Sequence, residues 1–277
     1  MRLSIKAYVS VELPLRMETC EVKGFTIDLS GKNAIVTGAS RGLGQAIAIG
    51  LAEAGAKVGI TSRSLKALEE TQSKITDFGG EFRQIELDVR DITAMSSILQ
   101  TVAHQVGEID ILVNNAGYEQ VCPSHEVTEE IWDTIMETNL KGAFFAAQTA
   151  ASSMVRSGRG GAIVNVCSLT SYIGVPTAVP YGSSKSGLLG MTRALSTEWA
   201  SDQIRVNAIA PGYFRTELTE AFYREEAWQK AMLQKIPLNS FGKAGDLKGA
   251  VVFLASDAAK YITGQCLAID GGYLASI

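Results

Sequence analysis

The sequence predicts a single α/β domain built on a doubly wound, seven-stranded parallel sheet with helices on both faces. From about residue 33 onward, short β-branched runs alternate with longer segments of helical period, which is the pattern of repeated strand–helix–strand units. Several of the runs are almost wholly apolar, as strands covered on both faces must be. Parallel strands joined by right-handed crossovers form a doubly wound sheet.

The predicted strands are the runs 34–37, 58–61, 82–87, 109–113, 162–166, 205–209 and 266–269. Helices are expected near 42–54, 64–77, 91–106, 128–156, 181–200 and 246–255. Thr128, followed by two glutamates, suits the start of a helix. The one irregular stretch, 211–245, is expected to form a lid over a site. Residues 1–24 lack the apolar core of a secretory signal and are expected to be a flexible extension, which leaves 25–277 as the domain.

Composition excludes several classes of partner. The 277 residues are 46% hydrophobic and 19% charged, with a formal net charge of −4, so the surface gains nothing from meeting nucleic acid or anionic lipid. No apolar run reaches the roughly 18 residues that suggest a membrane span. The four cysteines form no CxxC pair, and we expect no metal site. A cytoplasmic protein fits these features best.

A glycine turn follows the first predicted strand and opens the first helix. Its amides would point where a pyrophosphate can accept hydrogen bonds, and glycine is needed because a side chain would block close approach of the backbone. The spacing is G-x-x-x-G-x-G, with no Gly-Lys-Ser/Thr of a phosphate-binding P-loop. The expected dinucleotide contacts from this turn are Gly38, Ser40, Arg41, Gly42, Leu43 and Gly44.

The end of the second strand favours NADP(H) over NAD(H). An acidic residue usually binds the ribose 2′-hydroxyl of NAD at this place, whereas an arginine accommodates the 2′-phosphate of NADP. Here Ser62 and Arg63 end the strand with no acid, and Arg41 supplies a second positive charge beside the same pocket. We therefore expect Ser62, Arg63 and Arg41 to bind NADP(H).

Four polar residues are candidates for the chemistry. Tyr181 and Lys185 have i, i+4 spacing and share one face of a predicted helix. A free tyrosine has a pKa of about 10, and an adjacent cation favours its phenolate. Ser168 ends the strand 162–166, so its hydroxyl can reach the same edge of the sheet. Asn139 falls inside the predicted helix 128–156, where an amide is a mediocre helix former.

Taken together, the run 37–44, Asn114-Asn115-Ala116-Gly117, Asn139, Ser168, Tyr181 and Lys185 resemble the short-chain dehydrogenase/reductase family over about residues 25–275. The resemblance implies a Rossmann fold and reversible hydride transfer between a ketone and a secondary alcohol. It implies that Tyr181 is the acid/base, that Lys185 lowers its pKa and binds the nicotinamide ribose, and that Ser168 polarises the substrate oxygen. Asn139 would hold a water next to Lys185. Homotetramers or homodimers are usual in this family.

The resemblance also assigns further contacts. Asn115, Ala116 and Gly117 would lie against the cofactor, and Asp88 and Val89 at the adenine. The nicotinamide would meet the residues after the sixth strand, namely Pro211, Gly212, Phe214 and Thr216.

The substrate is expected to be a small ketone or alcohol. The sequence around 205–217, 235–238 and 263–272 is most similar to gluconate 5-dehydrogenase-type members, which act on sugar acids and polyols. Tyr118, Glu119 and Gln120 would give a polar pocket wall, and Tyr213 would also face the substrate. Two alternatives stay open. One is a 3-oxoacyl-thioester reductase, with Ile173, Val175 and Val179 lining an apolar slot. The other is a non-catalytic NADP(H)-binding regulatory protein.

Overall fold

The computed structural model describes residues 27–215, 223 and 225–277. These residues form a seven-stranded parallel sheet of order β3-β2-β1-β4-β5-β6-β7. The fold class predicted from the sequence is confirmed. The strands are β1 (Asn33–Val36), β2 (Lys57–Ser62), β3 (Phe82–Glu86), β4 (Ile111–Asn114), β5 (Gly161–Val166), β6 (Ile204–Pro211) and β7 (Cys266–Ile269).

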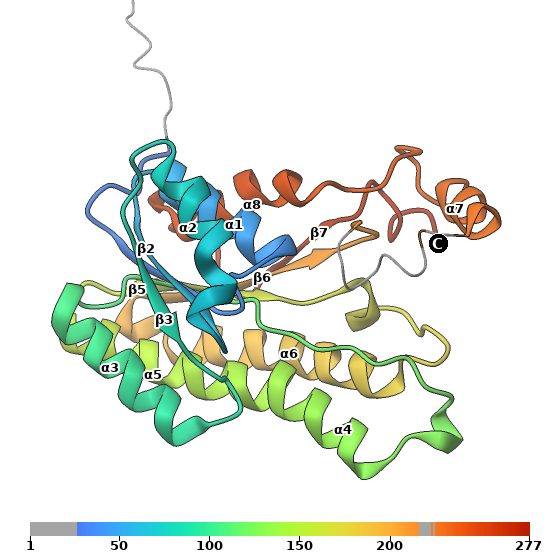
Figure 1. Ribbon diagram of the computed structural model, residues 1–277, viewed down its shortest axis with the longest axis horizontal. Helices are drawn as coiled ribbons and strands as arrows, with labels where there is room; N and C mark the ends of the chain where they lie inside the picture. Colours follow the sequence, from blue (N-terminus) through green and yellow to red (C-terminus); the bar gives the residue numbers. More distant parts are fainter. Residues whose placement is uncertain (1–26, 216–222, 224) are drawn as a thin grey trace, which may run out of the picture.

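Helices cover both faces of this sheet (Figure 1). On one face, α1 (Gly42–Glu53) packs against β1 and β2, α2 (Glu69–Thr76) against β3, and α8 (Lys248–Ala255) against β5 and β6, in a core that includes Ile47, Leu51 and Val251. On the other face, α3 (Ile92–Val106), α5 (Gly142–Ser157) and α6 (Val179–Glu198) bury Leu99, Ala146 and Leu195. Helices cover the central strands from both sides, which explains why polar and apolar residues alternate so little along them.

The order in which successive strands are added to the sheet reverses between β1 and β4. From β1 the order runs outward to β2 and β3, and from β4 it runs outward to β7. In open α/β sheets, ligands bind beyond the carboxyl ends of the strands at such a reversal. The carboxyl ends of β1, β4, β5 and β6 therefore define the edge where the predicted site residues must be sought.

The predicted helix over 128–156 is wrong in one respect. The structure divides it into α4 (Glu129–Met136), a π-helical turn (Glu137–Lys141) and α5. Thr128 caps α4 as expected, since its hydroxyl accepts a hydrogen bond from the Ile131 amide at 3.3 Å. The π turn contains Asn139, and such turns often occur at functional sites.

The stretch 211–245 is more regular than the sequence suggests. Pro211 still belongs to β6, and α7 (Glu226–Leu233) is a helix that the sequence reading did not predict. Figure 1 shows α7 beyond the end of the sheet, near the C-terminus. The predicted extension 1–24 and Thr216 lie outside the described residues. Within the described part of the chain, no helix is both long and apolar enough to cross a bilayer.

Candidate active site

The glycine turn after β1 packs tightly against the segment that follows β4. Gly38 has φ +65°, and a Cβ on it would lie 2.9 Å from the Ala116 Cα. A Cβ on Gly44 would collide with the Gly38 carbonyl oxygen and the Asn115 side chain. Both positions therefore require glycine for close backbone approach. The turn leads directly into α1, whose first amides are free of helical partners and can hold an anion.

Asn115 fixes the shape of this turn. Its Nδ2 donates hydrogen bonds of 2.9 Å to the carbonyl oxygens of both Thr37 and Gly38. The Thr37 hydroxyl in return accepts the Asn115 and Ala116 amides at 3.0 Å. The sequence reading assigned Asn115 a contact with the cofactor, which stays a prediction. It gave Thr37 no role of its own, because that role depends on a contact between strands 78 positions apart in the chain.

The ends of β2 and β3 bring Ser62, Arg63 and Asp88 together. Asp88 is half-buried, and Arg90 donates to its carboxylate at 2.9 Å. This hydrogen bond lowers the pKa of Asp88, and the positive charge of Arg63 lowers it further. Arg63 and Arg41 both expose their side chains at this end of the sheet. The cluster can therefore attract an anionic group such as a phosphate.

Ser168, Tyr181 and Lys185 meet at the carboxyl end of β5. Ser168 follows the strand, and its side chain interacts with Tyr181 on α6, where it opposes the rise in the pKa of the phenol. Lys185, one turn further along α6, is 3% exposed and donates to the Val166 carbonyl oxygen at 2.7 Å. Its Nζ lies 5.6 Å from the centre of the Tyr181 ring. The i, i+4 spacing read from the sequence thus places the cation beside the phenol.

Asn139 links this cluster to the segment after β4. Its Oδ1 accepts the Tyr118 amide at 2.7 Å, and its Nδ2 donates to the Tyr118 carbonyl oxygen at 2.9 Å. The same Nδ2 donates to the Ser184 hydroxyl at 3.0 Å. Asn139 is 1% exposed, so these bonds satisfy an amide that burial would otherwise make costly. Ser184, which the sequence reading did not single out, is the partner from α6.

Burial has the largest effect on the pKa values of Tyr181 and Lys185. It raises the pKa of Tyr181, and the nearby Glu119 carboxylate raises it further, while the hydrogen bond with Ser168 opposes both. Burial likewise lowers the pKa of Lys185. The net direction for the tyrosine is opposite to the one expected from an adjacent cation, because removing a phenolate from water outweighs the attraction.

Tyr118, Glu119 and Gln120, which were expected to form a polar pocket wall, follow β4 at the carboxyl edge of the sheet, and their place in a substrate pocket stays a prediction. Tyr118 is 37% exposed, and its hydroxyl donates to the Gln120 side chain at 2.9 Å. Between them, Glu119 is half-buried, and burial raises its pKa while the charge of Lys185 lowers it. The sequence reading placed Glu119 in the wall but did not foresee that its charge acts on both Tyr181 and Lys185.

The residues after β6 lie in a cluster of aromatic rings. The ring of Tyr213 contacts Tyr273 edge to face at 5.3 Å and Trp228 at 5.8 Å. Phe214 is 4% exposed and packs into the core, and the Gly212 amide donates to the Ile269 carbonyl oxygen at 2.9 Å. The structure therefore brings Pro211, Gly212 and Tyr213 to the same edge of the sheet as Ser168.

One potentially reactive thiol near the site is buried in the core. The Cys167 thiol, next to Ser168, is 2% exposed, and a hydrogen bond with Cys266 together with burial raises its pKa, so it stays protonated. In the described residues, no three His, Cys, Asp or Glu side chains gather to hold a metal.

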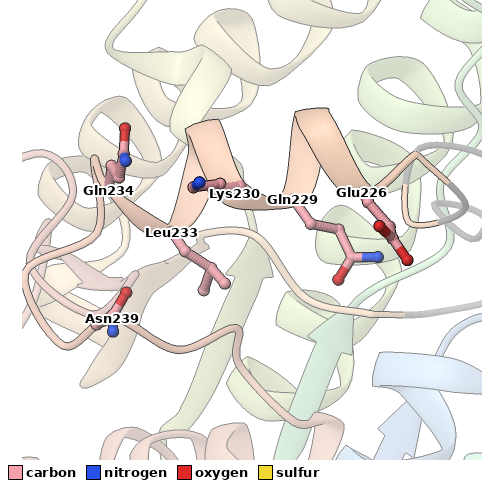
Figure 2. Close-up of a pocket in the computed structure, with 6 residues that line it drawn as sticks. All are labelled: Glu226, Gln229, Lys230, Leu233, Gln234 and Asn239. Atoms are coloured by element: carbon pink, nitrogen blue, oxygen red, sulfur yellow. The ribbon is translucent and has the colours of Figure 1, made fainter.

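A surface pocket lies against α7 (Figure 2). Its lining contains none of the predicted site residues and consists of Glu226, Gln229, Lys230, Leu233, Gln234 and Asn239. We therefore assign the site from the hydrogen-bonded cluster at the sheet edge.

Comparison with known protein sequences agrees with this geometry. A family model described as enoyl-(acyl carrier protein) reductase matches residues 38–274. A 2-dehydro-3-deoxy-D-gluconate 5-dehydrogenase of Dickeya dadantii is 40% identical over 250 residues, which are 90% of this chain and 98% of the relative. A 3-oxoacyl-[acyl-carrier-protein] reductase of Staphylococcus aureus is 40% identical over 242 residues, covering 87% of this chain and 97% of the relative.

Solved structures share the whole fold. A candidate short-chain alcohol dehydrogenase of Sinorhizobium meliloti 1021 superposes with a TM-score of 0.88 at 60% identity, covering 91% of this chain and 99% of that chain. A gluconate 5-dehydrogenase of Burkholderia cenocepacia J2315, in complex with NADP and tartrate, has a TM-score of 0.87 at 35% identity, covering 91% of this chain and 98% of that chain. The protein belongs to the short-chain dehydrogenase/reductase family and is an NAD(P)-dependent oxidoreductase that acts on CH–OH groups.

Proposed function

We propose that this enzyme interconverts a ketone and a secondary alcohol with NADP(H), and that its substrate is a sugar acid or a polyol. The observation that carries the proposal is the cluster of Ser168, Tyr181 and Lys185 at the carboxyl end of β5, beside the glycine turn. Relatives and solved structures named for sugar-acid dehydrogenation support the substrate class.

The residues of the glycine turn fit a dinucleotide. Gly38 and Gly44 lack the Cβ that would collide with neighbouring atoms, and α1 begins between them, at Gly42. Arg63 and Arg41 would hold the 2′-phosphate, and no acid ends β2 to compete for a 2′-hydroxyl. The remaining predicted contacts are Ser40, Gly42, Leu43, Ser62, Asp88, Val89, Asn115, Ala116, Gly117, Pro211, Gly212, Phe214 and Thr216. When bound, the nicotinamide supplies or accepts the hydride.

The chain's own residues manage the proton. In ketone reduction, the Tyr181 phenol gives its proton to the carbonyl oxygen, while the Ser168 hydroxyl donates a hydrogen bond to the same oxygen. Lys185 places a positive charge beside the phenolate that remains. Asn139 holds the neighbouring backbone and Ser184 in position. In alcohol oxidation, the phenolate takes the hydroxyl proton.

The stretch 211–245 forms the lid in this proposal, with Tyr213 facing the substrate and Tyr118 opposite. The aromatic cluster around Tyr213 anchors it to the C-terminal segment, where the Leu238 amide donates to the Gly271 carbonyl oxygen at 3.0 Å. The expected homotetramer or homodimer stays a prediction from the family resemblance.

A 3-oxoacyl thioester is the second candidate substrate. Val175 and Val179 are 37% and 48% exposed near the site and can meet an acyl chain, and a relative of equal identity is named for this reaction.

A cofactor and substrate screen tests these readings together. NADPH and NADH are each mixed with 5-ketogluconate, a neutral ketose and a 3-oxoacyl thioester, and NADP⁺ and NAD⁺ are each mixed with 2-dehydro-3-deoxygluconate, which has a secondary alcohol at C5. We expect NADPH oxidation with 5-ketogluconate and the ketose, NADP⁺ reduction with 2-dehydro-3-deoxygluconate, and neither with a Tyr181→Phe variant. Turnover of the thioester alone would establish the second reading. Equal rates for the wild-type enzyme and Tyr181→Phe with every substrate would contradict the proposed role of Tyr181.

A further inference from the structure

Glu119 lies at a fixed place beside the catalytic pair. A Cβ on Gly117 would lie 3.6 Å from both the Lys185 Nζ and the Asn139 Oδ1, so the chain entering Tyr118 and Glu119 runs past the ammonium group. Asn139 holds the Tyr118 peptide from both its N–H and its C=O. Glu119 is therefore attached to a backbone that the buried core of the site positions.

The Glu119 carboxyl has no hydrogen-bond partner or ion pair within the described residues. Lys185, whose charge acts on this carboxyl, donates instead to the Val166 carbonyl oxygen at 2.7 Å. A half-buried carboxylate without a donor is costly, and a ligand that brings donors lowers this cost. The expected ligand is a neutral hydroxyl, because a carboxylate accepts up to four hydrogen bonds and donates none.

The same charge repels anions at the reacting carbon. The electrostatic effect of Glu119 on Tyr181 places it close to the phenol that meets the substrate oxygen. A substrate carboxylate bonded directly to the reacting carbonyl would face Glu119, and like charges in a half-buried site are unfavourable. A carboxylate several carbons away would avoid this contact.

We propose that Glu119 is a specificity-determining residue that binds the hydroxyls flanking the reacting carbon and excludes ketones that carry an adjacent carboxylate. The inference rests on the proposed function. It separates sugar-acid ketones into those that the enzyme should accept and those that it should exclude. It predicts that a sugar acid binds with its hydroxylated end, not its carboxylate end, against Glu119.

Two isomers separate these cases. In 5-ketogluconate the ketone has hydroxylated neighbours, whereas in 2-ketogluconate it adjoins the carboxylate. The measured quantity is the ratio of kcat/KM for the 5-keto over the 2-keto isomer with NADPH. Both isomers use the same Tyr181 and Lys185, so effects on proton transfer largely cancel in this ratio.

Glu119→Gln keeps the size of the side chain and removes its charge. We expect the ratio to fall on the order of 10- to 100-fold, through a higher KM for the 5-keto isomer and a lower KM for the 2-keto isomer, with kcat changed less. Glu119→Asp retains the charge and should retain most of the selectivity. Glu126→Gln, which neutralises an exposed glutamate of the same loop, should leave the ratio unchanged. NADPH affinity, measured by fluorescence, checks that each variant is folded.

The selectivity should also depend on pH. Among the described residues, Lys185 and Tyr181 on α6 interact electrostatically with Glu119, and burial raises the pKa of this carboxyl above its ordinary value. Protonation removes the charge, so the wild-type ratio should fall as the pH is lowered, whereas the ratio of Glu119→Gln should stay level.

An unchanged ratio in a folded, active Glu119→Gln enzyme would overturn this inference and leave the proposed function standing. A wild-type enzyme that reduces no ketone of the panel would overturn the proposed function and this inference with it.

Discussion

The proposed catalytic cluster and the described part of the proposed lid are held by different kinds of contact. Asn139, Ser184 and Lys185 are each buried and hold one another or the backbone through hydrogen bonds of 2.7 to 3.0 Å. The lid is held instead by edge-to-face and stacked rings of Tyr213, Trp228, Tyr273, Tyr223 and Phe241. Hydrogen bonds fix a direction, whereas ring packing tolerates small shifts. We therefore expect the chemistry, together with the contribution of Glu119 to substrate choice, to belong to the rigid region, and the lid to adjust substrate affinity.

This comparison predicts that variants of the cluster lower kcat and that variants of the lid change KM. The largest effect is expected for Tyr181→Phe, because the substrate oxygen loses its proton donor. We expect kcat for ketone reduction to fall on the order of 10³-fold, with NADPH affinity unchanged. Steady-state rates and fluorescence titration measure both. A loss of less than tenfold would remove Tyr181 from the central role.

Lys185→Met should lower activity on the order of 10²-fold and change the pH profile. Alcohol oxidation needs the phenolate, so its rate rises as the pH passes the pKa of Tyr181. That pKa is already raised by burial, and removing the neighbouring cation raises it further. The rise should therefore move to higher pH in a kcat/KM profile. A profile at the wild-type position would show that Lys185 does not act on the tyrosine.

Asn139→Ala should affect stability as well as rate. It leaves the Tyr118 peptide and the Ser184 hydroxyl without a buried partner, and we expect the free energy of unfolding to fall by about 2 kcal/mol. Urea unfolding measures this, with Gln148→Ala on the exposed side of α5 as the control. Equal stability of the two variants would contradict a structural role for Asn139.

Arg63→Ala tests the cofactor end, which is more exposed than the catalytic cluster. We expect the KM for NADPH to rise about 10-fold and that for NADH to change little, because only NADPH carries the 2′-phosphate. Lys66→Ala, an exposed cation nearby in the sequence, serves as the control. Parallel changes for both cofactors would remove the argument for NADP(H).

The smallest effect is expected in the lid. Tyr273→Phe keeps the ring contact with Tyr213 and removes the hydroxyl whose interaction with Tyr213 raises the pKa of that phenol. The loss of one polar interaction costs about 1 kcal/mol, so the substrate KM should rise a few-fold with kcat unchanged. A fall in kcat as large as that of Lys185→Met would place the lid within the catalytic machinery.

The sequence predicted the sheet because apolar runs mark buried strands. An i, i+4 pair must share a helical face, but Tyr181 and Lys185 became candidates only together with Ser168, Asn139, the glycine turn and the family resemblance, and their roles stay predictions. Thr37 and Ser184 were not predicted, since each acts through partners distant in the chain. The π turn at Asn139 and helix α7 were also not predicted, because tertiary contacts, rather than the hydrophobic periodicity of the sequence, determine whether they form. The influence of Glu119 on Tyr181 likewise depends on burial, which no spacing reveals.

The central claim is that a proton from Tyr181 is transferred as the ketone is reduced. A single-turnover measurement of NADPH oxidation with 5-ketogluconate, in H₂O and in D₂O, tests it most directly. We predict a slower turnover in D₂O for the wild-type enzyme, since the phenol proton is exchangeable, and no such difference in the residual rate of Tyr181→Phe. Equal wild-type rates in the two solvents, or an isotope effect that persists in Tyr181→Phe, would contradict the account.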